Sequence, residues 1–238
     1  MTILAFDTAS ETLALGLSVN GAERFFLEIS GNLRHSELIM GSVDTLLATA
    51  GIAKTDLEAV ACMEGPGSFT GLRIGFAAAK GLSMALDIPI ITVPTLDCMA
   101  YSFSFWPGVL LPLIDAKKNS FFTALYRRGN RLSSYLDIDI DSLLETIKNN
   151  PSFSSSQSLL LTGPAVPLAL PSFNAAFPGT SACGCKRGYA AELLKLAEET
   201  GIVSLTDAAQ AKLRNSSCGP LYLRKSDAEL NNMDKQNG

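Results

Sequence analysis

One short pattern occurs twice in this chain and restricts its fold more than any other feature. An apolar run ending in aspartate, Ile3–Asp7, returns as Leu111–Asp115, and a glycine of a hairpin turn, Gly21 or Gly129, lies fourteen residues after each aspartate. Between aspartate and glycine, alternating residues fill matching places: Leu13, Leu15 and Leu17 in the first copy, Phe121, Thr123 and Leu125 in the second. Such repetition predicts a duplicated domain. Strands followed by helices, twice over, predict an α/β fold of two lobes, 1–106 and 107–238, each a mixed sheet with flanking helices.

The first copy has clear element signals. Alternating or continuous apolar residues predict strands near 3–6, 13–19, 25–29, 57–63 and 88–93, with Asn20-Gly21 as a hairpin turn. Apolar residues at helical spacing predict helices over about 35–50 and 70–86, and a third helix opens near 95. The second copy is looser: we expect a Ser-rich surface loop at 151–158, little regular structure over 171–188, a helix over about 189–199 and a frayed tail over 231–238.

Composition excludes several classes of protein. A chain of 238 residues that is 47% hydrophobic has enough apolar material for a core. A net charge of −4 argues against a protein that binds nucleic acid alone. We expect no membrane span, because no apolar run approaches about 18 residues, and a cytoplasmic location, because no export signal precedes the five cysteines. Cys183-Gly184-Cys185 is either half of a metal site or a pair of loop thiols, and the absence of a second Cys/His pair favours thiols.

The glycine-rich segment Gly65–Gly75 lies between a predicted strand and a predicted helix. Its residues Gly65, Pro66, Gly67, Ser68, Phe69 and Thr70 precede the helix, whose amino terminus offers unpaired N–H groups that favour an anion. The segment lacks the Gly-Lys-Ser/Thr of a P-loop and the third glycine of a dinucleotide fingerprint. A tight turn with Ser68 or Thr70 as helix cap is therefore the favoured interpretation.

The helix after this segment contains Gly71, Gly75 and Ala79 at intervals of four residues. Glycine in a helix costs about 0.8–1 kcal/mol relative to alanine. The spacing therefore predicts close approach by another backbone, which is either this protein's own sheet or a helix of a partner.

Three other groups of residues allow a functional and a structural interpretation. Asp7 and Asp115 follow strands as phosphate-binding aspartates do, but Thr8-Ala9 and Ala116-Lys117-Lys118 stand where glycine is expected, which argues against a kinase. His35 is a general base or, more simply, a polar surface residue in the first turn of a helix. The basic residues Lys117, Lys118, Arg127, Arg128 and Arg131 are predicted on one hairpin, as a solvated face or as a contact for RNA or an acidic partner.

The chain resembles the bacterial TsaB (YeaZ) family. The resemblance rests on Phe6-Asp7-Thr8-Ala9, His35-Ser36-Glu37, the Gly65–Gly75 string, Ile114-Asp115-Ala116 and Pro220-Leu221-Tyr222-Leu223-Arg224, and it is unclear only over 150–188. It implies the duplicated actin-like/sugar-kinase (ribonuclease H-like) fold. It also implies a non-catalytic subunit of the bacterial machinery that makes threonylcarbamoyladenosine next to the tRNA anticodon.

In that family the catalytic paralogue is TsaD, and the resemblance implies that this chain pairs with TsaD and helps to recruit the ATPase TsaE. It further implies a homodimer when TsaD is absent, contact with tRNA only through the complex, and no cofactor bound by this chain, with ATP used through TsaE and the metal held by TsaD. Thr95 and Met99 stand where TsaD carries its metal-binding His-x-x-x-His pair, and neither can replace an imidazole on iron or zinc.

We expect the helices over about 35–50 and 70–86 to form the partner face. The residues expected there are Leu38, Leu46, Gly71, Arg73, Gly75, Ala78 and Ala79. On this hypothesis Gly75→Leu abolishes TsaD binding while the lobe stays folded. The alternatives are a small-molecule kinase or ATP-binding protein of the same fold, and a glycoprotease-like peptidase, which the missing metal pair and triad disfavour.

Overall fold

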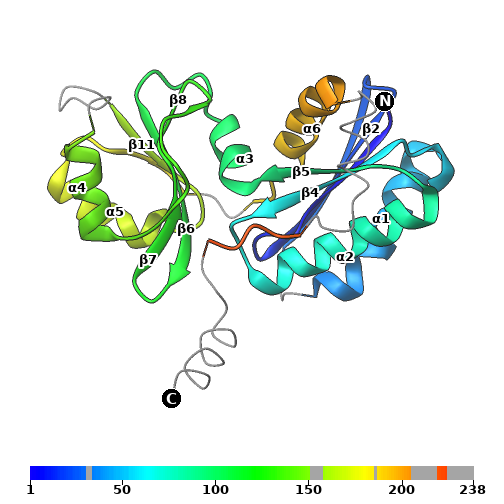
Figure 1. Ribbon diagram of the computed structural model, residues 1–238, viewed down its shortest axis with the longest axis horizontal. Helices are drawn as coiled ribbons and strands as arrows, with labels where there is room; N and C mark the ends of the chain where they lie inside the picture. Colours follow the sequence, from blue (N-terminus) through cyan, green and yellow to red (C-terminus); the bar gives the residue numbers. More distant parts are fainter. Residues whose placement is uncertain (31–33, 151–157, 185–186, 205–218, 224–238) are drawn as a thin grey trace, which may run out of the picture.

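Figure 1 shows the computed structural model, which describes residues 1–30, 34–150, 158–184, 187–204 and 219–223. Two α/β lobes lie side by side, with helices on their outer faces and helices between them (Figure 1). The first lobe contains β1 (Ile3–Asp7), β2 (Thr12–Val19), β3 (Glu23–Ser30), α1 (His35–Ala50), a 3₁₀ turn (Lys54–Asp56), β4 (Ala59–Gly65), α2 (Phe69–Leu86), β5 (Ile90–Pro94) and α3 (Thr95–Tyr101). The second contains β6 (Val109–Lys117), β7 (Ser120–Thr123), β8 (Tyr126–Arg127), β9 (Asn130–Arg131), β10 (Leu136–Asp139), α4 (Ile140–Lys148), β11 (Leu159–Thr162), α5 (Val166–Ala176) and β12 (Ser181–Cys183), followed by α6 (Ala190–Ser204).

The two sheets repeat one topology. The first has the order β3-β2-β1-β4-β5, and the main path of the second is β10-β7-β6-β11-β12. In each sheet the first two pairings are antiparallel and the last two are parallel. The duplicated two-lobed α/β fold is therefore confirmed. The predicted Gly129 hairpin is the β8–β9 turn, in which Arg128 and Gly129 both have positive φ.

The strand register of the two copies differs by one residue at the two aspartates. Asp7 pairs with Ala14 across the β1–β2 loop, whereas Asp115 pairs with Phe121 across a shorter β6–β7 connection. Residues directly opposite each other share a face of the sheet. Asp115 therefore lies with Phe121 on the face that α4 and α5 cover, whereas Asp7 faces α6 and accepts a hydrogen bond from the Tyr189 N–H. The expected equivalence of the two aspartates does not hold in space.

Helices α1 and α2 cover the outer face of the first sheet, and α4 and α5 cover the outer face of the second (Figure 1). Helices α3 and α6 lie between the lobes, where one apolar cluster joins Ile3 of the first sheet, Leu110 of the second and Leu194 of α6. Helix α6 follows the second sheet in sequence but packs on β1, β2 and β5 of the first. The chain thus crosses back to the first lobe beyond residue 189.

The segment 171–188 is more regular than its composition indicates. Helix α5 begins at Val166 and ends at Ala176 in spite of Pro167 and Pro171, and β12 follows. Pro167 is tolerated because the first helical positions need no N–H donor, and Ala169 and Phe173 anchor the helix by being fully buried. The predicted loop at 151–158 and frayed tail at 231–238 lie almost wholly outside the described residues.

Candidate functional site

Three separate stretches of the chain meet where α2 begins. The loop after β1 contacts the glycine-rich turn, because the Ser68 N–H donates to the Ala9 carbonyl at 2.8 Å and the Thr8 hydroxyl donates to the Gly71 carbonyl at 2.7 Å. Residues 219–223 join the same place, where the Leu221 N–H donates to the Glu64 carbonyl at 2.7 Å. The motifs Asp7–Ala9, Gly65–Gly75 and Pro220–Leu223 are therefore parts of one site.

The glycines Gly71 and Gly75 of α2 lie against the loop that follows β1. Of the two neighbours considered, this protein's own sheet or a helix of a partner, the structure shows the first. A Cβ atom at Gly71 would overlap the Thr8 carbonyl oxygen, and one at Gly75 would overlap the Thr8 hydroxyl. A Cβ atom at Gly67 would lie 2.7 Å from the Ala9 carbonyl oxygen. The close neighbour is this protein's own sheet end. The predicted helix cap is confirmed at Ser68, whose hydroxyl accepts from the Gly71 N–H at 3.2 Å.

Asp7 is buried at the closed end of this site. Its carboxylate accepts hydrogen bonds from the Ala9 N–H at 3.0 Å and the Tyr189 N–H at 2.7 Å. Burial raises the pKa of the Asp7 carboxyl to about 6, and these two hydrogen bonds oppose the rise. Both oxygens are occupied by backbone donors, so Asp7 here joins β1 to the start of α6.

His35 is not the surface residue that its place in the first turn of α1 indicates. It is buried, with 3% of its surface exposed, and its Nε2 lies 2.8 Å from the Ser10 carbonyl oxygen. No side chain caps the amino terminus of α1. His35 therefore ties the start of α1 to the loop after β1.

A cleft of about 1090 Å³ separates the lobes beside these loops. Its wall includes Asp7, Ser68, Lys118 and Tyr189, together with Thr95 and Met99 of α3. Thr95 and Met99, which the resemblance sets at the positions of the two metal-binding histidines of TsaD, are both buried, and neither is among the Cys, His and carboxylate ligands of protein zinc sites. Among the described residues, no three His, Cys, Asp or Glu side chains come together as a metal site would require.

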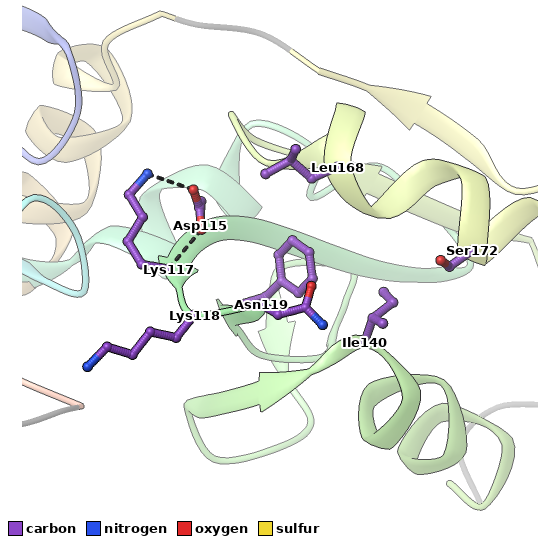
Figure 2. Close-up of a pocket in the computed structure, with 8 residues that line it drawn as sticks. Asp115, Lys117, Lys118, Asn119, Ile140, Leu168 and Ser172 are labelled. Carbon is purple, nitrogen blue, oxygen red and sulfur yellow. Dashed lines mark hydrogen bonds and ion pairs between the residues drawn. The ribbon is translucent and has the colours of Figure 1, made fainter.

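The basic residues predicted on one hairpin lie at opposite ends of the second lobe. Lys117 and Lys118 form the β6–β7 turn beside the cleft, with Asn119, and all three have positive φ. Figure 2 shows Lys117 folded back on Asp115. The Asp115 carboxylate accepts one hydrogen bond from the Lys117 backbone N–H and another from the Lys117 Nζ, each at 2.7 Å. This turn borders a hollow of about 390 Å³ against α5. Arg127, Arg128 and Arg131 lie instead on the hairpin β8–β9. This hairpin pairs with β6 at Leu110, opposite Tyr126, which is seven residues or about 23 Å along the strand from Lys117.

The seven residues expected at the partner face are divided between core and surface. Leu46, Gly71, Gly75 and Ala79 are buried inside the first lobe, Leu38 and Ala78 are half-buried, and Arg73 is exposed. The buried four face the interior of the first lobe: Gly71 and Gly75 lie against Thr8, and Leu46 and Ala79 belong to the core cluster under α1 and α2. The expectation that Gly75→Leu spares the fold is therefore wrong, since its side chain would collide with Thr8.

Phe69 and Arg73 of the glycine-rich segment form a cluster with Tyr222, a grouping that the sequence did not predict. The Arg73 guanidinium lies 3.8 Å from the centre of the Phe69 ring, and its Nε donates to the Tyr222 hydroxyl at 3.1 Å. The two ring centres are 5.0 Å apart. The residues around Tyr222 contributed to the family resemblance. The contact between Tyr222 and Arg73 could not be predicted, because the two residues are 149 positions apart in the sequence.

Comparisons with known proteins identify the family of this chain. Residues 31–231 match the family described as TsaD, tRNA N6-adenosine threonylcarbamoyltransferase. The tRNA threonylcarbamoyladenosine biosynthesis protein TsaB of Bacillus subtilis is 37% identical over 134 residues, which cover 56% of this chain and 58% of that protein. TsaB of Escherichia coli is 38% identical over 130 residues, covering 54% of this chain and 56% of that one. The chain thus spans a little over half the length of these relatives.

The solved structure of YeaZ from Pseudomonas aeruginosa shares the fold. It superimposes with a TM-score of 0.75 at 22% identity, over 93% of this chain and 99% of that one. Separately, none of the helices within the described residues combines the length and the apolar character that crossing a bilayer requires.

Proposed function

The chain belongs to the TsaD family, within its TsaB (YeaZ) group, and on that premise we propose that it takes part in tRNA threonylcarbamoyladenosine synthesis as a non-catalytic subunit. In this proposal it pairs with TsaD, helps to recruit TsaE, forms a homodimer when TsaD is absent, and meets tRNA only within the complex. ATP then acts through TsaE and the metal through TsaD.

The observation that carries the proposal is an exposed stripe along α2. Thr70, Arg73, Ala77, Gly81 and Met84 are all exposed and follow one another at intervals of three or four residues, so they share one side of the helix. Met84 is 84% exposed, and a Cβ atom at Gly81 would meet nothing within 4 Å. Neighbouring α1 contributes Met40, 40% exposed, and Gly41, which is equally open.

Small residues with exposed methionines suit close contact with another helix pair. Glycine and alanine allow two backbones to approach, and methionine adapts its shape to the surface it meets. A residue such as Met84 gains nothing from solvent exposure, and apolar groups gathered on a surface mark an interaction site. The partner face is therefore the outer side of α1 and α2, with Arg73 retained from the expected set and the four buried residues removed.

The test is reconstitution of tRNA modification from purified TsaD and TsaE, with and without this chain. We expect modification to depend on the chain, and we expect Gly81→Glu to lower both TsaD co-purification and modification by at least tenfold. Ala175→Glu is the matched control, because Ala175 is exposed on α5 of the other lobe and does not line the cleft, and it should leave both measurements unchanged. Equal modification without the chain would refute the proposal.

A further inference from the structure

Residues 219–223 form a strap that runs from the first lobe toward the second (Figure 1), and its Tyr222 ring lies 5.0 Å from the ring of Phe69, the first residue of α2. The Leu221 N–H donates to the Glu64 carbonyl, and Leu221, Tyr222 and Leu223 line the cleft. Gly65 makes this position possible, because a Cβ atom there would lie 2.7 Å from the Leu221 carbonyl oxygen. The strap is thus seated by a backbone hydrogen bond on one side and by the Tyr222 side chain on the other.

Tyr222 extends the exposed stripe of α2 at its amino-terminal end. Arg73 is the second residue of that stripe, and the Tyr222 hydroxyl accepts from it at 3.1 Å. Tyr222 itself is 39% exposed. A protein that covers Ala77, Gly81 and Met84 therefore reaches the Phe69–Arg73–Tyr222 cluster by continuing one or two turns along the same helix.

We propose that the strap completes the partner face, so that its docking on α2 and the binding of the TsaD-type partner stabilise each other. This inference rests on the proposed function. Tyrosine and arginine are the residue types that most often dominate binding energy at protein interfaces. Because linkage is reciprocal, a partner that binds the docked strap more tightly must also hold the strap in place.

The cluster also indicates what the partner offers at this point. Within the part of the chain that the structure describes, the Arg73 guanidinium donates from Nε to Tyr222, while its planar face rests on Phe69. Its two terminal nitrogens remain as donors in a fixed fork, which suits a carboxylate. We therefore expect the partner surface to present an acidic side chain opposite Arg73.

The experiment compares three variants of the full chain with the wild type in binding to purified TsaD. We expect Tyr222→Ala to weaken binding about tenfold, and Tyr222→Phe, which keeps the ring, to remain within about threefold of the wild type. Phe105→Ala is the matched control, because Phe105 is an aromatic residue that is 74% exposed outside the stripe, and it should bind as the wild type does.

Hydrogen exchange at the Leu221 amide supplies a second readout, because this N–H is bonded to Glu64 only when the strap is seated. We expect TsaD to slow its exchange in the wild type and in Tyr222→Phe, but not in Tyr222→Ala. Wild-type binding of Tyr222→Ala, with Leu221 exchange unchanged by TsaD, would overturn the strap inference alone. Failure of the wild-type chain to bind TsaD would instead overturn the proposed function.

Discussion

At the scale of single residues, the glycines of α2 have opposite roles according to what lies beside them. A Cβ atom at Gly71 would overlap the Thr8 carbonyl oxygen, which belongs to the backbone and cannot rotate away, whereas Gly81 faces open space. We expect Gly71→Ala to lower the free energy of unfolding by about 1–3 kcal/mol. Gly81→Ala should raise it by about 0.5–1 kcal/mol, because alanine is the better helix former. Urea denaturation of both variants checks the pair, and equal effects would contradict this account.

Asp7 makes the stability of the protein depend on pH in a stated direction. Burial raises the pKa of its carboxyl from 3.8 to about 6, so the folded state favours the protonated form. The stability that this preference contributes is complete below pH 3.8 and is lost as the pH rises through about 6. At 1.36 kcal/mol per pKa unit, we expect wild type to lose roughly 3 kcal/mol relative to Asp7→Asn across that window.

Denaturation at pH 4 and pH 7 measures this difference. Asp139→Asn is the control of opposite sign, because hydrogen bonds from Ser142 lower the pKa of the Asp139 carboxyl, whose contribution is lost as the pH falls. If the free energy of unfolding changed by the same amount in the wild type and in Asp7→Asn between the two pH values, the raised pKa of Asp7 would not contribute to stability, contrary to this prediction.

At the scale of helices and strands, the spacing of apolar residues predicted the helices whose formation depends on that spacing. Helix α1 runs over His35–Ala50 as its apolar spacing predicts, and α2 begins one residue before the predicted 70. Helix α5 was missed because two prolines broke its signal, although its buried face holds it in place. The meeting of Asp7, Ser68 and Tyr222 depends on contacts between distant segments, which no local pattern contains. The one-residue shift at Asp115 depends likewise on strand register.

The attachment of α1 is a test at this scale. His35→Leu removes the ring nitrogen that meets the Ser10 carbonyl and leaves that half-buried oxygen without this donor. We expect a loss of about 1–3 kcal/mol in the free energy of unfolding. Ser36→Ala, on the exposed side of the same turn, should stay within about 0.5 kcal/mol of wild type. Thermal and urea denaturation measure both variants. Equal losses of stability in His35→Leu and Ser36→Ala would show that the contact between His35 and Ser10 does not stabilise the attachment of α1.

At the scale of the whole molecule, α6 makes the first lobe dependent on the end of the chain. A Cβ atom at Gly16 would lie 2.7 Å from the Leu194 side chain, so β2 is shaped to receive this helix. Glu198 accepts hydrogen bonds from Ser18 and from Arg24 at 2.7 Å each. Without α6, the face of the first sheet that contains Ile3 and Ala5 would be open to water. The first lobe therefore includes α6, although the duplication divides the sequence near residue 107.

This dependence predicts that residues 1–106 alone do not form a stable lobe. Exposing a sheet face of fully buried residues forfeits about 25 cal/mol for each Å² of apolar surface, and a domain has only about 5–15 kcal/mol of stability to lose. We expect the 1–106 fragment to lack a cooperative urea transition, and the same fragment joined by a flexible linker to 187–204 to regain one. The linked fragment with Leu194→Asp is the matched control and should fail, because Leu194 is fully buried against the sheet. A cooperative transition in the unlinked fragment, at the midpoint of the linked one, would show that α6 contributes nothing to the first lobe.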